Sequence, residues 1–231
     1  MTDERFIEGV DPYDAWDREA ARIEAHLATL ADDDPAWEQQ SRCEAWTVRD
    51  VLAHLRATEE YFAACIAFTV SDFLAEVGSR GATDLESFNA VGIADQAGKP
   101  PSQLLSEWSA MDATARQGFR ERDGGDVDTS VGPYSARWQA FHLASELATH
   151  ADDMLIPETD ADRPWRTAWR APFSRFALTE TKPDLTVEDP ADGRTRVHGS
   201  GVDLEVDDET LVAAVAGRID DPTLAPLSTA V

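Results

Sequence analysis

The sequence predicts a mainly α-helical protein: a four-helix bundle followed by a small α+β region. Four long segments in the first two thirds of the chain repeat apolar residues at helical spacing. After Pro157 and Pro164 the pattern changes to short strand-like runs separated by glycine turns. The 231 residues are enough for one full domain and a smaller second one. We therefore expect a bundle over residues 1–158 and a small α+β C-terminal domain over residues 159–231.

The first two predicted helices follow from apolar spacing and from one capping pattern. Apolar residues recur every three or four positions between Pro12 and Leu30. The second helix is predicted to start at Thr47, which forms with Asp50 the Thr-x-x-Asp pattern of a capping box. We expect this helix to continue toward Phe73.

The other two bundle helices are predicted beyond an interrupted stretch. Glycines and the Gly-Lys-Pro-Pro sequence indicate a long connection over residues 78–101. Helical spacing returns from Leu104 to Phe119. The fourth helix is expected to begin near Pro133, because proline is well tolerated in a first turn, and to run to about Met154.

The C-terminal region is predicted to contain a short helix, three short strands and a last helix. The short helix is expected over residues 168–178, and the last helix over residues 209–216, with Gly217 as its C-cap. Asp192-Gly193 and Gly199–Gly201 are expected to be the turns between strands. The expected strands are residues 184–188, 195–198 and 202–206.

Composition excludes several classes of partner. A formal net charge of -25 disfavours nucleic acid and anionic lipid surfaces, since like charges repel. The first ten residues lack a basic and apolar leader pattern, and no apolar run approaches twenty residues. We therefore expect a cytoplasmic protein without a membrane span. The two cysteines, Cys43 and Cys65, are expected to be free thiols.

Two of the predicted helices can direct three metal ligands at one point. Glu146 and His150 are four residues apart and so share one side of the fourth helix, while His54 would come from the second. Two imidazoles and one carboxylate make a three-ligand site with an open position. Catalytic zinc sites keep such a position, whereas structural zinc sites are usually closed by four protein ligands.

Three motifs in this chain resemble a known family. The segment 43–55 reads Cys-Glu-Ala-Trp-Thr-Val-Arg-Asp-Val-Leu-Ala-His-Leu, the fourth helix carries Glu146-x-x-x-His150-x-x-Asp153, and Ala-Gly precedes Arg218. Together, in this order, they resemble the mycothiol-dependent maleylpyruvate isomerase family, within the DinB-like metalloenzyme superfamily. The resemblance implies a DinB-like bundle for the first domain.

The resemblance also implies an activity. It implies Zn²⁺ bound by His54, Glu146 and His150, with mycothiol or another low-molecular-weight thiol completing the coordination. Arg218 would be a catalytic or substrate-holding residue. The thiol would add to a cis double bond conjugated with a carbonyl, and elimination after rotation would give the trans product. The partners would be this thiol and a small anionic or electrophilic substrate, for an isomerase or a related thiol transferase.

Each residue also has a simpler interpretation. His54 is compatible with the edge of an amphipathic helix, and Glu146 with His150 is compatible with an ordinary charge pair on a solvated face. An arginine at position 218 would also be expected if it only stabilised the C-terminus of the preceding helix. Asp153 is either an acceptor that orients a ligand histidine or a surface acid. The alternative function is a non-catalytic metal- or small-ligand-binding protein on the same bundle.

Three neighbouring residues are not decided by the motifs. His142 lies four residues before Glu146, and is a fourth ligand, a base lining the thiol pocket, or a histidine with another partner one turn away. As a fourth ligand it would close the site and argue against catalysis. Trp46 is expected to pack between helices or to form a wall of the pocket. Cys43 is expected to be buried structure rather than a nucleophile.

Overall fold

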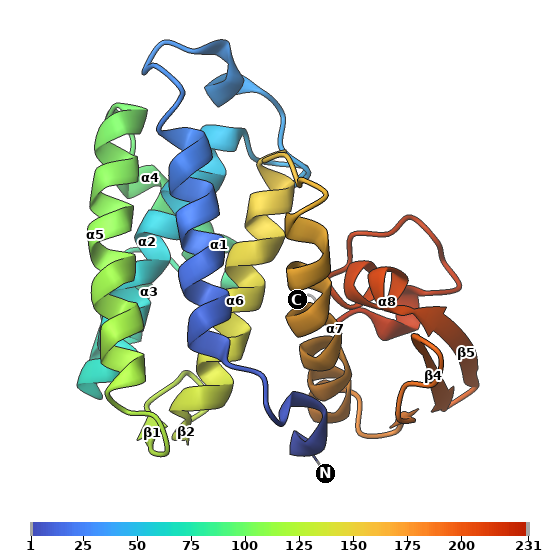
Figure 1. Ribbon diagram of the computed structural model, residues 1–231. Helices are drawn as coiled ribbons and strands as arrows, with labels where there is room; N and C mark the ends of the chain where they lie inside the picture. Colours follow the sequence, from blue (N-terminus) through green and yellow to red (C-terminus); the bar gives the residue numbers. More distant parts are fainter. Residues whose placement is uncertain (1, 230–231) are drawn as a thin grey trace. The chain divides into compact units, whose positions relative to one another are not determined.

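The computed structural model describes residues 2–229 and confirms a mainly α-helical chain with a small α+β region after it (Figure 1). The chain divides into two units, one of which is Pro12–Pro157, and the other the segments before and after it. The larger unit contains α1 (Pro12–Leu27), η2 (Pro35–Glu38), α2 (Val48–Ala67), α3 (Val70–Ser79), α4 (Leu85–Asp95), α5 (Pro101–Arg120), β1 (Asp126–Val127), β2 (Tyr134–Ser135) and α6 (Ala136–Asp153). Its long helices α1, α2, α5 and α6 form the predicted four-helix bundle.

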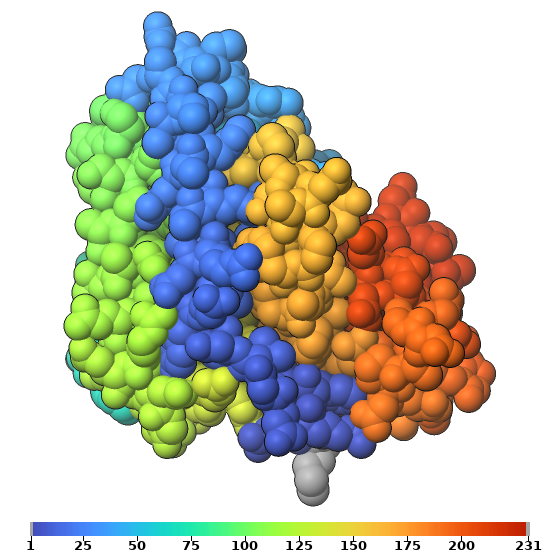
Figure 2. Space-filling model, viewed as in Figure 1, coloured from blue at the N-terminus to red at the C-terminus, as the bar shows by residue number. Residues whose placement is uncertain are grey.

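Large aromatic side chains fill the interior of this bundle. Trp16 of α1 is fully buried, with its ring centroid 5.7 Å from that of Phe119 on α5 and 6.3 Å from that of Phe62 on α2. The Trp16 Nε1 donates a hydrogen bond of 2.7 Å to the buried carboxylate of Asp112. On the face viewed in Figure 2, side chains of α1 and α5 meet along both helices. Burial of apolar surface therefore holds the bundle together.

The predicted capping box at the start of α2 is confirmed. Thr47 accepts a hydrogen bond from the Asp50 backbone N–H, and the Asp50 side chain accepts one from the Thr47 backbone N–H at 3.0 Å. Two of the otherwise unsatisfied N–H groups at the helix start are thereby paired. This start matters for the site because α2 carries His54.

Replacing Thr47 with alanine is expected to lower the free energy of unfolding by about 1 kcal/mol, because the cap hydrogen bond is lost. Thr69→Ala is the matched control, since Thr69 precedes α3 but makes no side-chain capping bond. Urea unfolding of both variants measures the difference. Equal effects of the two substitutions would contradict a capping role for Thr47.

The prediction that the second helix continues toward Phe73 is wrong. The helix ends at Ala67, and Phe68 adopts the left-handed conformation with φ 58°. The N–H of Thr69 then bonds to the carbonyl of Ala64 at 3.0 Å, which pairs a carbonyl at the helix end. A phenylalanine rarely takes this conformation, so the sequence lacked the usual glycine signal. The chain resumes as α3.

The expected long connection over residues 78–101 is also corrected, because most of it is helical. The end of α3 and the whole of α4 lie within it. The helix α4 begins with a capping box between Asp84 and Ser87. None of its residues is buried, so it lacks the apolar stripe facing a core on which helix prediction from sequence depends.

The fourth bundle helix begins three residues later than expected. Residues Tyr134–Ser135 form β2, which pairs antiparallel with β1 in the loop that precedes α6. Ser135 is the N-cap, and its hydroxyl accepts a hydrogen bond from the Trp138 N–H. This cap fixes the start of α6, which carries Glu146 and His150.

The smaller unit contains the predicted α+β elements. They are η1 (Glu4–Ile7), α7 (Asp162–Thr181), β3 (Thr186–Val187), β4 (Arg194–Gly199), β5 (Val202–Asp207), α8 (Asp208–Val215) and η3 (Ala225–Leu227). The strands form one antiparallel sheet in the order β3-β4-β5. The helix α7 is longer than the predicted helix 168–178, because Arg166 and other residues of its first half are buried as well.

The predicted turns and the final C-cap are present in this unit. Asp192 and Gly193 both have positive φ, 50° and 73°, as a tight hairpin turn requires. After α8, Gly217 has φ 66°, and the N–H of Arg218 bonds to the carbonyl of Ala213 at 2.8 Å. These are the features of a glycine-terminated helix end. Among the described residues, no helix is long and apolar enough to cross a membrane.

Candidate metal centre

The three candidate ligands predicted from the sequence lie together in the bundle. His54 comes from α2, and Glu146 and His150 from successive turns of α6. Their potential ligand atoms all lie within 4.8 Å of one another. The His54 Nε2 is 3.3 Å from the Glu146 Oε1, and the two imidazole centroids are 4.9 Å apart.

The 3.3 Å between the His54 Nε2 and the Glu146 Oε1 fits two ligands of one tetrahedral ion. Ligands at about 2.0–2.1 Å from a tetrahedral zinc lie about 3.3 Å from each other. Two nitrogens and one carboxylate oxygen are a donor set that zinc accepts, and both histidines are largely buried, with exposed side-chain fractions of 6% and 12%. The residues present therefore fit a divalent metal with an open coordination position.

Burial and neighbouring charges shift the pKa values of the three candidate ligands. Burial lowers the pKa of His54, outweighing its hydrogen bond with Glu146, so the imidazole is in the neutral form that binds metals. Burial alone would raise the pKa of Glu146, but the hydrogen bond from His54 and the charges of three histidines, His54, His150 and His142, lower it. The carboxylate is therefore ionised at neutral pH.

His150 has the opposite shift. Burial opposes its charge, but hydrogen bonds with Asp153 and Cys43 and the charge of Glu146 raise its pKa to about 9. In the metal-free protein His150 is thus protonated at neutral pH. Because a metal ligand must be deprotonated, metal binding there releases a proton from His150.

A second group of residues orients His150. Its Nδ1 lies 3.1 Å from the Oδ2 of Asp153, and a carboxylate can only accept, so Nδ1 is the donor and Nε2 is the nitrogen left for a metal. The Cys43 Sγ donates to the same carboxylate oxygen at 3.2 Å. Asp153 is fully buried. This geometry supports a role for Asp153 as the acceptor that orients a candidate ligand histidine, rather than as a surface acid.

Cys43 has a more specific place than the sequence indicated. It is half-buried, and with His150 and Asp153 it forms a second group of potential ligand atoms within 4.8 Å. The backbone N–H of Arg42 bonds to the Asp153 carbonyl at 3.0 Å, which ties this loop to the end of α6. Sequence reasoning missed the contact because Cys43 and Asp153 are 110 positions apart.

Trp46 covers the two histidines. Its ring centroid is 4.9 Å from that of His54, at an interplanar angle of 34°, and 6.3 Å from that of His150. The hydroxyl of Ser41 donates to the Trp46 carbonyl at 2.7 Å, which holds the loop before α2 in place. Trp46 thus forms one wall of the site, beside both imidazoles.

His142 has a different partner. Its Nε2 lies 3.2 Å from the hydroxyl of Tyr134, and it belongs to neither group of potential ligands within the described chain. Its charge nevertheless contributes to lowering the pKa of Glu146. The structure therefore favours a histidine with its own partner one turn from the ligands.

Arg218 lies in the smaller unit, two residues after Ala216 at the end of α8. Its Nη1 donates to the Ala216 carbonyl at 3.3 Å, which is a helix-end contact. A catalytic role for Arg218 stays a prediction.

Replacing Asp153 with asparagine is expected to weaken zinc binding by about 10–100-fold, because the amide is a weaker acceptor and no longer fixes the His150 ring. Asp152→Asn, one position away, removes the same charge without contact to the His150 Nδ1. Competition with a fluorescent chelator measures both affinities. If the two variants bind zinc equally, Asp153 has no orienting role.

Comparisons with known proteins bear on this site. The family model described as "Mycothiol maleylpyruvate isomerase N-terminal domain" matches residues 16–155, which is more than half of the chain. The matched stretch includes His54, Glu146, His150 and Asp153, and leaves Arg218 outside. No curated protein and no solved structure matches the chain significantly.

Proposed function

Because the chain belongs to the mycothiol maleylpyruvate isomerase family, matched through its N-terminal domain, we propose that it is a zinc-dependent enzyme that uses a low-molecular-weight thiol. The thiol is mycothiol or a related small thiol. The reaction is addition of the thiol to a conjugated cis double bond followed by elimination, or a related thiol transfer. We place the enzyme in the cytoplasm, where small thiols are kept reduced.

The observation that carries this proposal is the convergence of His54, Glu146 and His150, with ligand atoms within 4.8 Å of one another. All three lie in the part of the chain that the family model matches. Zinc bound there would lower the pKa of a coordinated thiol and so supply a thiolate at neutral pH.

The protein's own residues prepare the site for this chemistry. Glu146 supplies a negative charge, while the neutral His54 supplies a nitrogen lone pair. Asp153 keeps the Nδ1 of His150 protonated and thereby directs Nε2 to the ion. Trp46 packs on the imidazoles and keeps water away from that side of the site.

Arg218 is proposed to serve the substrate rather than the metal. Addition of a thiolate to a double bond conjugated with a carbonyl leaves negative charge on the carbonyl oxygen. A guanidinium can stabilise such an oxyanion, or hold a carboxylate through two parallel hydrogen bonds. In a chain of net charge -25, binding of a negatively charged substrate or intermediate requires a cation beside it.

Thiol-dependent conversion of a maleyl compound tests the proposal. We expect turnover that requires both added thiol and zinc, that is lost on chelation, and that returns when zinc is restored. Tight zinc binding without any thiol-dependent turnover would instead favour the alternative, a non-catalytic metal- or small-ligand-binding protein. Identifying the thiol that co-purifies with the zinc-loaded protein would name the second partner.

A further inference from the structure

Glu59 is a buried acid that the proposed metal chemistry does not use. It lies on α2, five residues after His54, and only 2% of its surface is exposed. Within the described part of the chain, its Oε2 has no hydrogen-bond partner. Buried carboxyl groups are nearly always paired, because an unpaired one loses its hydration without compensation. An unpaired acid at this depth therefore indicates a function.

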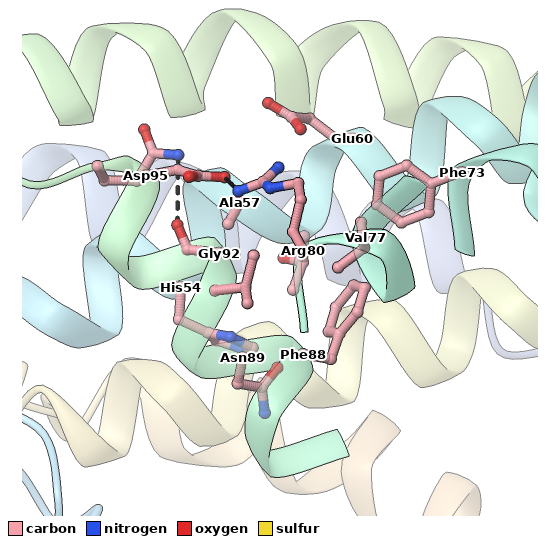
Figure 3. A pocket seen from close by; sticks show the side chains of 13 residues that line it. His54, Ala57, Glu60, Phe73, Val77, Arg80, Phe88, Asn89, Gly92 and Asp95 are labelled. Carbon is pink, nitrogen blue, oxygen red and sulfur yellow. Dashed lines mark hydrogen bonds and ion pairs between the residues drawn. The ribbon is translucent and has the colours of Figure 1, made fainter. Parts of the chain in front are cut away.

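The next residue, Glu60, has the ordinary environment of a surface acid. It lines a small pocket beside α3 and α4 (Figure 3). It is exposed, and its Oε1 accepts a hydrogen bond of 2.9 Å from the Nη1 of Arg56. Glu59 is instead turned toward acids of α5 and α6, inside the bundle.

The surroundings of Glu59 keep its carboxyl group neutral. Burial raises its pKa well above the ordinary value, and the carboxylates of Asp112 on α5 and Glu146 on α6 raise it further. The charge of Arg116 on α5 opposes this shift. The Arg116 Nε, however, already donates to the Asp112 carboxylate at 2.7 Å, so much of its charge is balanced there. At neutral pH Glu59 is therefore a carboxylic acid, which can donate a hydrogen bond as well as accept one.

A second buried group beside Glu59 also lacks a partner. Trp108 of α5 is fully buried, and its Nε1 lies toward the Glu59 carboxyl group. Among the described residues this Nε1 has no hydrogen-bond partner. One carboxyl oxygen and one N–H donor are thus left together in the interior. A water molecule that joins such groups typically makes about three hydrogen bonds.

Glu146 supplies the third side of this group. Its Oε1 is 3.3 Å from the His54 Nε2, and its charge acts on Glu59. No direct hydrogen bond joins the carboxyl groups of Glu59 and Glu146 in the described chain. A polar contact just beyond direct reach is where a bridging water fits. Carboxylates that bind a metal are themselves commonly held by a further hydrogen bond.

We propose that one water molecule binds between Glu59, Trp108 and Glu146, and that Glu59 positions the Glu146 carboxylate through this water. The water accepts hydrogen bonds from the Trp108 Nε1 and the Glu59 hydroxyl, and donates one to Glu146. Glu59 is a positioning residue, since it acts through the water and not on the ion. The inference rests on the proposed function, because it takes Glu146 as a metal ligand, and it adds the residue that holds this ligand.

Two substitutions of Glu59 in the full-length protein test this inference. Glu59→Met removes the donor but keeps an unbranched side chain, and should weaken zinc binding by about tenfold. Glu59→Gln keeps a donor for the water, so its zinc affinity should stay within about threefold of the unmodified protein. Competition with a fluorescent chelator measures the affinities, and thermal unfolding shows whether each variant is folded. A purely structural role would make zinc affinity follow the unfolding midpoint, without rescue by glutamine.

Glu60→Met is the matched control, because it makes the same change one position along α2, at an exposed residue outside the group. Its zinc affinity should be unchanged. If Glu59→Met binds zinc as tightly as the unmodified protein, or Glu59→Gln loses as much affinity as Glu59→Met, Glu59 does not position Glu146.

Infrared spectroscopy tests the same inference if Glu59→Met does not fold. The unmodified protein at pH 7 should show the C=O stretching band of a protonated carboxyl group, which Glu59→Gln lacks. This band should shift when zinc is added, because the water couples Glu59 to the ligand Glu146. Zinc binding without a shift, or the absence of the band, would overturn the inference alone. An unmodified protein that binds no zinc would overturn the proposed metal site, and the role of Glu59 with it.

Discussion

Replacement of His54 by alanine is expected to abolish zinc binding and thiol-dependent turnover together. One of three ligands is lost, so zinc affinity should fall on the order of a thousandfold. The helices should remain, because burial in the bundle rather than the metal supplies most of the stability. Zinc analysis after dialysis, a turnover assay and far-ultraviolet circular dichroism on the same sample measure the three quantities.

His26→Ala is the matched control for this variant. His26 lies in the last turn of α1, outside both groups of potential ligands, so zinc content and turnover should be unchanged. Wild-type zinc affinity in His54→Ala would show that the ligand set is wrong. Loss of helical circular dichroism when zinc is chelated from the unmodified protein would show that the metal is structural, which argues against catalysis.

Replacement of Arg218 by lysine is expected to lower turnover by about tenfold to a hundredfold while zinc content stays the same. Lysine keeps the charge but loses the planar pair of donors that holds a carboxylate or an oxyanion. Steady-state kinetics and zinc analysis of one preparation separate the two effects.

Arg194→Lys provides the control for Arg218. Arg194 is an exposed arginine of β4 in the same unit, where it pairs with Glu205 at 2.9 Å. This control should retain full turnover. Full activity in Arg218→Lys would show that Arg218 has no catalytic role and only stabilises the helix end, where it contacts the Ala216 carbonyl. Thermal unfolding of both variants shows whether the fold is retained.

Local sequence signals predicted the parts of the fold that depend on local physics. The capping box of Thr47 and Asp50, the turn at Asp192-Gly193 and the end of α8 at Gly217 each depend on one or two residues, and each is present. Prediction was wrong where tertiary structure decides. Phe68 follows the last residue of α2 in the left-handed conformation, which is usually adopted by glycine. The helix α4 has no buried residues, so it lacks the stripe of buried apolar side chains that a helix prediction relies on.

The candidate site was predictable in one part and not in another. Glu146 and His150 share a helix face by spacing alone, and the motifs added His54. The placement of Cys43 and Trp46 depends on contacts between the loop that precedes α2 and the end of α6, which no short-range sequence pattern encodes.

X-ray absorption at the zinc edge, on protein loaded with one equivalent of zinc and no added thiol, tests the metal site most directly. We predict one tightly held zinc per chain, with only nitrogen and oxygen neighbours at about 2.0–2.1 Å and a signature of two imidazoles. The sulfur of Cys43 should be absent from the first shell. A sulfur neighbour at about 2.3 Å, or a protein that retains no zinc, would contradict the assignment of His54, Glu146 and His150.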